Sequence, residues 1–207
     1  KKYIFTFFAI TLSMAASAGQ LPMKLWYNSP AQYFEESLPI GNGKLGALVY
    51  GNPDQDILYL NDITFWTGKP VNLNEGGDAY KYIPLIRQEL FKENYKEADI
   101  LQHLVQGHNS ENYQPLSTLK INDYAKGSVS NYYRELDIDS AITKVRYTRG
   151  DVTFNREYLA SNPDKLIAIH LTASKKASIN CEILLTGQTP HKIKAADKQI
   201  TMLGNAI

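Results

Sequence analysis

Cysteine and histidine are scarce in this 207-residue sequence, which has one of the former and four of the latter. A single cysteine excludes an internal disulfide, and so few of both residues argue against a metal centre or a Cys–His nucleophile. Cys181 lies in an alternating run in which Ile179, Ile183 and Leu185 share its face. We therefore expect a structural thiol on the apolar side of a strand, and neither a metal nor a cofactor.

An excess of charge is also missing, because the formal net charge is +1. The longest basic run is the pair Lys175 and Lys176, which is too short for a phosphate-binding patch. These features predict no nucleic-acid partner. With 43% hydrophobic residues, the chain can bury one substantial core.

Long hydrophobic runs are limited to the stretch at positions 3–16, which is shorter than the roughly 20 residues that span a bilayer. Lys1 and Lys2 precede it and Ala-Ser-Ala at 16–18 follows it, the pattern of a secretory signal peptide. We expect a signal peptide at 1–18, a mature domain at 19–207, no membrane span after cleavage, and a secreted or periplasmic location. A buried N-terminal helix is the alternative interpretation.

Most of the remaining sequence has the two-residue alternation of strands and is rich in tyrosine, with 14 in all. Several strands joined by short turns, each partly apolar on both faces, favour a mainly β fold, an antiparallel two-sheet β-sandwich. The predicted strands lie at residues 47–50, 119–121, 134–138, 145–147, 152–158, 166–172, 179–185 and 199–203.

Only residues 84–106 have helical periodicity. Pro84 suits a first helical turn, and Asn94 with Glu97 resembles a capping box that restarts a helix, while Gly107 could end it. We predict a short two-helix excursion packed on a sheet.

Gly41, Gly43 and Gly46 match the dinucleotide-binding pattern G-x-G-x-x-G. That pattern binds a pyrophosphate only when a strand precedes it and a helix opens at its last glycine. Here a polar, proline-bounded segment precedes the glycines and a short β-like run follows them. We therefore expect glycines that serve chain turning and close backbone approach.

No convincing pair of catalytic carboxylates is present. A glycosidase needs two carboxyl groups about 5–9.5 Å apart across the scissile bond. The adjacent acidic residues at 35 and 36 would diverge in an extended chain, those at 54 and 56 are predicted to lie in a polar turn, and those at 137 and 139 flank an inward Ile138. The sequence thus predicts no catalytic residue in this chain.

A series of motifs nevertheless resembles the N-terminal domain of glycoside hydrolase family 95, the α-L-fucosidase family, from about Leu25 to the end. The motifs follow the family's order: Leu-Trp-Tyr at 25–27, Pro-Ala at 30–31, Glu-Glu-Ser-Leu-Pro-Ile-Gly-Asn-Gly at 35–43, Leu-Asn-Asp-Ile-Thr-Phe-Trp at 60–66, Tyr-Gln-Pro-Leu at 113–116, Tyr-Arg-Glu-Leu-Asp at 133–137 and Arg-Glu-Tyr at 156–158. The sequence departs from the family at 62–69, where Asp-Ile, Phe and Thr-Gly-Lys replace its usual residues.

The resemblance implies a β-sandwich of the supersandwich type. It also implies that catalysis, with inversion at the anomeric carbon, takes place in a later (α/α) barrel that this chain lacks. The implied substrates of the parent enzyme are fucosylated oligosaccharides or related α-L-galactosides, and the implied partner is the missing C-terminal catalytic barrel. The strand pattern at the C-terminus leads us to expect that the polypeptide continues beyond position 207.

Sugar contacts within this domain, if any, are predicted at Asn42, Asn61, Asp62, Thr64 and Trp66. An indole stacks on the apolar face of a pyranose, while amides, hydroxyls and carboxylates bond its hydroxyl groups. The alternative is that Trp66 packs against the missing barrel and Asp62 caps a turn. A free-standing carbohydrate-binding module is the competing prediction for the chain as a whole.

Overall fold

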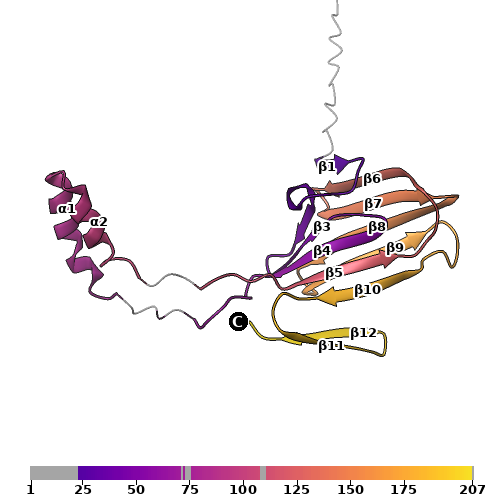
Figure 1. The fold of residues 1–207 in the computed structure, drawn as a ribbon. Helices are drawn as coiled ribbons and strands as arrows, with labels where there is room; N and C mark the ends of the chain where they lie inside the picture. The colour runs from indigo at the N-terminus through magenta and orange to yellow at the C-terminus, as the bar shows by residue number, and fades with distance from the viewer. Residues whose placement is uncertain (1–22, 71, 73–75, 108–110, 207) are drawn as a thin grey trace, which may run out of the picture.

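The computed structural model describes residues 23–70, 72, 76–107 and 111–206, and its strands form two five-stranded antiparallel sheets and a hairpin (Figure 1). The first sheet has the order β1 (Lys24–Tyr27), β6 (Val129–Asp137), β7 (Ile142–Arg149), β8 (Val152–Ser161) and β9 (Leu166–Ala173). The second has the order β10 (Cys181–Thr186), β5 (Ser117–Asp123), β4 (Gln55–Asp62), β3 (Leu45–Val49) and β2 (Leu38–Gly41). The predicted signal peptide at 1–18 lies outside the described residues.

The mainly β sandwich predicted from the sequence is confirmed, and each predicted strand overlaps an observed one. A third sheet that was not predicted as separate consists of β11 (His191–Ala196) and β12 (Gln199–Gly204). Alternation explains the core between the two large sheets, because every second residue of each strand points inward. The buried cluster comprises Ile40, Ala47, Val49, Leu58, Ile121, Val145, Tyr147, Phe154 and Tyr158. Cys181 is half-buried against this cluster and has a free thiol, as predicted for a structural residue.

A charged network crosses the core and joins the two sheets. Asp56 is fully buried and accepts hydrogen bonds from the Gly51 N–H at 2.7 Å and from the Tyr158 hydroxyl. Arg156 lies 3.6 Å from the Asp56 carboxylate and 3.2 Å from that of Asp123. The prediction that Asp56 lies in a polar turn is therefore wrong, because its inward position on β4 places it in the core opposite an arginine.

The β2–β3 hairpin contains the glycines of the G-x-G-x-x-G pattern. Gly41 pairs with Gly46 across the hairpin, and Gly43 occupies the turn with a φ of 87°, a conformation that favours glycine. A strand follows the last glycine instead of a helix. The structure thus agrees with the expectation that these glycines serve the backbone and not a dinucleotide.

Two helices, α1 (Ile83–Phe91) and α2 (Tyr95–Gln102), confirm the predicted two-helix excursion. They pack on each other, but the helix pair stands apart from both sheets (Figure 1), so the prediction that they pack on a sheet is wrong. The inner faces of the two large sheets already bury one another. None of the helices in the described part of the chain is long and apolar enough to cross a membrane.

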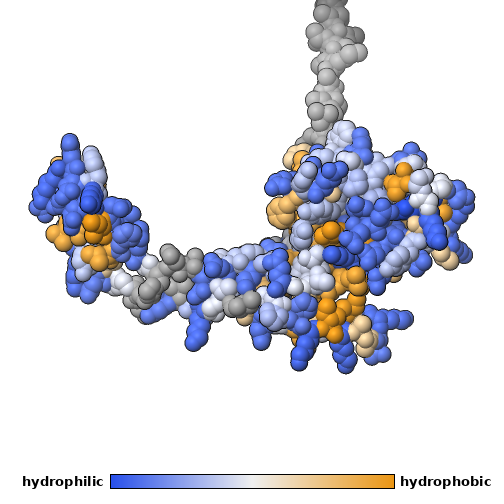
Figure 2. Space-filling view, viewed as in Figure 1, coloured by the Kyte–Doolittle hydropathy of each residue, from blue (hydrophilic) through white to orange (hydrophobic). Residues whose placement is uncertain are grey.

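The apolar side chains of the helix pair are largely exposed, and Figure 2 shows them on its surface. Phe91 is 88% exposed, and Ala98 is the one residue of the two helices that is buried. The Asn94 side chain makes no cap and donates to Glu89 at 2.9 Å, so the predicted capping box is absent, and α2 ends five residues before Gly107.

Ile138 was predicted to point inward but is 46% exposed. It follows β6 in a turn where the Asp137 carboxylate accepts hydrogen bonds from the N–H groups of Asp139 and Ser140 at 3.0 and 3.2 Å. The side-chain alternation stops where the strand ends, and the turn exposes Ile138.

Candidate functional site

Three of the residues predicted to contact sugar, Asp62, Thr64 and Trp66, lie at the base of the helical excursion, where β4 ends. The other two, Asn42 and Asn61, lie in the β2–β3 turn and on the outer face of the second sheet. Beyond β4, residues 63–70 run antiparallel to residues 111–116, and we call this ladder the stem. Its backbone bonds join Thr67 N to Asn112 O at 2.9 Å and Gln114 N to Phe65 O at 3.0 Å. An isolated β-bridge pairs Trp66 with Tyr113.

Asn42 is occupied by structural bonds in the β2–β3 turn. Its side-chain oxygen accepts from the N–H groups of Lys44 and Leu45 at 3.0 and 2.7 Å, and its amide nitrogen donates to Ser161 O at 2.7 Å. These bonds tie the turn to the end of β8. Because oxygen and nitrogen are both engaged, Asn42 positions the hairpin.

Asp62 and Thr64 bond to each other at the start of the stem. The Asp62 carboxylate accepts from the Thr64 N–H at 2.9 Å and from the Thr64 hydroxyl at 2.7 Å, as in the turn cap that was the alternative interpretation. These bonds, the hydroxyl first, lower the pKa of Asp62. The carboxylate is thus held ionised, as an acceptor and not as a proton donor.

The Trp66 side chain is 44% exposed, and one edge of its indole ring is held by neighbouring residues. Its indole N–H donates to Ile63 O at 2.8 Å, and its ring meets Tyr113 edge to face with centroids 5.5 Å apart. With Thr64, Gly68 and other stem residues it lines a hollow of about 340 Å³. The ring is therefore fixed in orientation and open to a partner.

Asn61 lines a different depression, on the outer face of the second sheet. This outer groove has a volume of about 350 Å³ and is lined by Phe34, Pro39, Ile40, Gly46, Ala47, Leu48, Tyr59, Leu60, Asn61, Tyr113 and Pro115. Asn61 is exposed, and no hydrogen bond occupies its amide among the residues that the structure describes. Of the five predicted residues, it is the one with an uncommitted polar side chain.

Two glycines leave space beside Asn61. Strand pairing places Gly41, Gly46 and Asn61 in one row across β2, β3 and β4. A Cβ atom on Gly46 would lie 3.8 Å from the Asn61 Cβ, so both positions face the same side of the sheet. Without side chains at the two glycines, the floor of the groove is open next to the amide.

Aromatic rings form the walls of the outer groove. Tyr59, two residues before Asn61 and on the same face, lies 6.1 Å from Phe34 and meets Tyr50 edge to face at 5.5 Å, measured between ring centroids. Phe34 belongs to the 3-10 turn η1 (Phe34–Glu36). The buried Arg134 secures this turn by donating to the Glu36 carbonyl oxygen at 2.6 Å.

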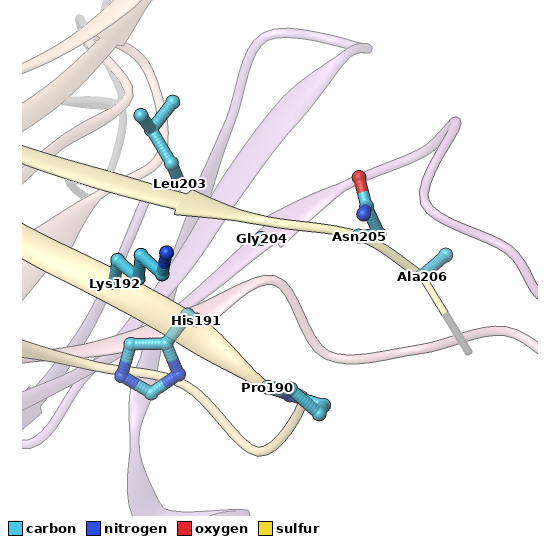
Figure 3. A pocket seen from close by; sticks show the side chains of 7 residues that line it. All are labelled: Pro190, His191, Lys192, Leu203, Gly204, Asn205 and Ala206. Carbon is cyan, nitrogen blue, oxygen red and sulfur yellow. The ribbon is translucent and has the colours of Figure 1, made fainter.

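Another hollow, of about 630 Å³, lies at the open end of the β11–β12 hairpin. Figure 3 shows that its side chains come from two paired strand ends and do not converge: Leu203 and Asn205 point to one side and Pro190 to the other. The His191 ring is in hydrogen-bond contact with the Thr189 carbonyl oxygen at 2.7 Å. This hollow presents no convergent set of polar groups and is not the candidate site.

The buried carboxylates do not form a reaction centre. Asp56 and Asp123 both lie beside Arg156 between the sheets, where a substrate has no access. Burial raises the pKa of Asp56 above its ordinary value of 3.8, although Arg156 and the Tyr158 hydrogen bond oppose the shift. Across the described ranges, no group of three His, Cys, Asp or Glu side chains is placed to hold a metal ion. The hollow beside Trp66 and the outer groove are instead suited to binding an amphipathic ligand.

Sequence reasoning missed the three aromatic walls, Phe34, Tyr59 and Tyr113. Tyr59 could have been found from the sequence, because it lies two residues before Asn61 and side chains at that spacing share one face of a strand. Phe34 and Tyr113 come from a turn and from the stem, so no local pattern connects them with β4. Their association depends on the tertiary fold.

An antiparallel two-sheet sandwich with an aromatic groove on its outer face defines the structural class. Residues 25–207 match the family model described as glycosyl hydrolase family 65, N-terminal domain, and the chain belongs to this family. The predicted resemblance to the N-terminal domain of a fucosidase-like glycoside hydrolase is confirmed, whereas the matches do not distinguish family number 95 from 65.

Two similar proteins carry fucosidase names. Alpha-L-fucosidase 2 of Arabidopsis thaliana is 33% identical over 189 residues, covering 89% of this chain and 22% of the relative. Probable alpha-fucosidase A of Aspergillus niger is 28% identical over 199 residues, covering 88% of this chain and 24% of the relative. The chain therefore spans between a fifth and a quarter of the length of these relatives.

Proposed function

We propose that this chain is the non-catalytic N-terminal β-sandwich of a larger α-L-fucosidase-like hydrolase. The observation that carries this proposal is the match of residues 25–207 to an N-terminal domain family, together with relatives named as fucosidases that are about four times as long. The parent enzyme is proposed to act on fucosylated oligosaccharides with inversion, as in family 95, through an (α/α) barrel outside this chain.

The chemistry of the described residues supports a non-catalytic role. Hydrolysis needs two accessible carboxyl groups about 5–9.5 Å apart. Asp56 and Asp123 are both held beside Arg156 with side chains that are 0% and 6% exposed, so they do not form such an accessible pair. The length of the relatives favours this role over a free-standing carbohydrate-binding module.

The proposed partner of the domain is the catalytic barrel. The helix pair exposes Phe91 and Tyr95 at 88% and 65%, and Trp66 is 44% exposed in the stem. Exposed apolar surface of this kind marks a contact with another protein surface. We propose that the barrel covers the helix pair and the open face of Trp66.

The full-length polypeptide, assayed on a methyl α-L-fucoside by proton NMR, tests the activity. An inverting mechanism places water on the face opposite the leaving group, so β-L-fucose is the expected first product. Release of the α-anomer first would contradict inversion, and the absence of fucose release would contradict the proposed activity.

The secreted or periplasmic location is tested separately. The expected mature N-terminus is Gly19, produced by cleavage after Ala18, and mass spectrometry of the protein from the extracellular or periplasmic fraction measures it. Recovery of the intact N-terminus from the cytosolic fraction alone would contradict this location.

A further inference from the structure

We propose that the outer groove is a glycan-binding subsite that holds one 6-deoxyhexose residue. The groove itself is argued from the geometry of β2, β3 and β4, and the choice of a deoxy sugar rests on the proposed function. The subsite comprises the floor at Gly41 and Gly46, the Asn61 amide, and the rings of Tyr59 and Tyr113.

The size of the groove fits a small ligand. Its volume of about 350 Å³ falls at the lower end of the roughly 300–1,000 Å³ typical of small-molecule pockets. The floor is formed by strand backbone, and the β2–β3 hairpin is pinned by the Asn42 bonds to Ser161. The space is thus pre-formed, which lowers the cost of ordering on binding.

Rings held in place on both sides suit a pyranose. Tyr59 is fixed between Phe34 and Tyr50, and Tyr113 is fixed by Trp66 and by a hydroxyl bond to Asp62 O at 3.3 Å. Exposed fractions of 36% for Tyr59 and 42% for Tyr113 leave ring surface available. Such amphipathic rings bury the apolar C–H face of a sugar while their hydroxyls remain near water.

Asn61 supplies the directional contact. An amide offers two N–H donors and an acceptor oxygen, which together can bond two neighbouring sugar hydroxyls. The Asn61 amide is uncommitted among the described residues, while the remaining lining is mostly apolar. A ligand that fits this surface has one polar edge and an otherwise apolar outline.

A 6-deoxyhexose has this outline, because a methyl group replaces the hydroxymethyl group of a hexose. Apolar wall residues such as Pro39 and Leu48 can accept the methyl group without leaving a polar group unpaired. The groove is therefore expected to prefer a methyl α-L-fucoside over the methyl α-L-galactoside, which differs only by the additional hydroxyl.

Binding of the two glycosides to the purified chain tests the inference. Titration followed by NMR is expected to give saturable shifts of the Asn61 side-chain amide, with at least fivefold weaker binding of the galactoside. Gly46→Ala adds a methyl to the floor, 3.4 Å from Ile40 O and at an unstrained position, and should weaken fucoside binding at least fivefold. Asn61→Ala should weaken it similarly.

Matched controls separate the groove from the rest of the chain. Gly107→Ala, where no atom lies within 4 Å of the new Cβ, and the exposed Asn205→Ala should leave fucoside binding unchanged. Thermal unfolding of all four variants shows whether the fold is retained.

Two results would overturn the inference: no saturable binding by the wild-type chain, or fucoside binding that Gly46→Ala and Asn61→Ala leave intact. The first would leave the groove as an apolar surface covered by another part of the protein. Neither result bears on fucose release by the full-length polypeptide, so the proposed function fails or stands separately.

Discussion

Asp56 is the residue on which the joining of the two sheets most depends. It bonds to Tyr158 and to the Gly51 N–H, lies beside the charge of Arg156, and is itself fully buried. A buried pair of this kind contributes little net stability compared with an apolar core, yet removal of one partner leaves the other buried and without a counter-charge. The contribution of the Asp56–Arg156 pair to stability is therefore measured by substituting one of the two residues.

Asp56→Ala should lower the free energy of unfolding by about 3–5 kcal/mol, because it leaves Arg156 and Tyr158 buried and less well paired. Urea unfolding measures this change. Asp78→Ala, whose carboxylate is 76% exposed, is the matched control and should change the free energy by less than about 0.5 kcal/mol. Equal effects of the two substitutions would show that the network does not bear on stability.

The pH dependence of stability tests the protonation of Asp56. Burial raises the pKa of this carboxyl in the folded state above the ordinary 3.8, so the folded protein binds its proton more tightly than the unfolded chain does. The stability of the wild type relative to Asp56→Asn should therefore increase as the pH falls from about 7 to about 4. Urea unfolding across this range measures the difference, and a decrease would contradict the raised pKa.

At the residue scale, the sequence predicted some features and not others. The strand predicted at 152–158 is confirmed, and its alternation places Arg156 on the buried face between Phe154 and Tyr158. The alternation of β4 likewise buries Asp56 with Leu58. Asp56 was predicted to lie in a turn because the sequence of one strand does not show that a residue of opposite charge, Arg156, faces it from the other sheet. The sugar-contact residues were predicted as a set, but Asn42 and Asp62 satisfy their own backbone turns.

Among the secondary-structure elements, the helix pair departs most from expectation. The sequence correctly indicated two helices, since Ile83, Ile86 and Leu90 share a face. It did not indicate where that face would pack, because an amphipathic pattern identifies the apolar face of a helix but not the surface that covers it. The stem is joined by the Trp66–Tyr113 bridge, and the helices stand apart from the sheets (Figure 1).

Self-association of the isolated chain should depend on this helix pair. With Phe91 88% exposed, the pair presents an apolar surface that copies of the chain can bury against each other. Phe91→Asp should reduce concentration-dependent association in analytical ultracentrifugation. Ile138→Asp, in the exposed turn after β6, is the control and should not reduce it. A wild-type chain that remains monomeric at all concentrations would contradict an uncovered contact surface at the helices.

In the whole molecule, the sandwich and the helix pair have separate roles. The two sheets enclose one core and carry the outer groove, while the helix pair and stem provide the proposed contact with a catalytic barrel. The order of sequence motifs predicted this domain type, and the family match confirms it. The position of the proposed barrel could not be predicted, because the chain spans only 22–24% of the length of the relatives.

Release of fucose from a fucosylated oligosaccharide tests whether this domain is non-catalytic, with the purified chain and the full-length polypeptide assayed side by side at equal molar concentration. We expect release by the full-length polypeptide and none by the chain, because the chain's buried carboxylates, Asp56 and Asp123, cannot reach a glycosidic bond. Measurable release by the chain alone would contradict the assignment of a non-catalytic domain.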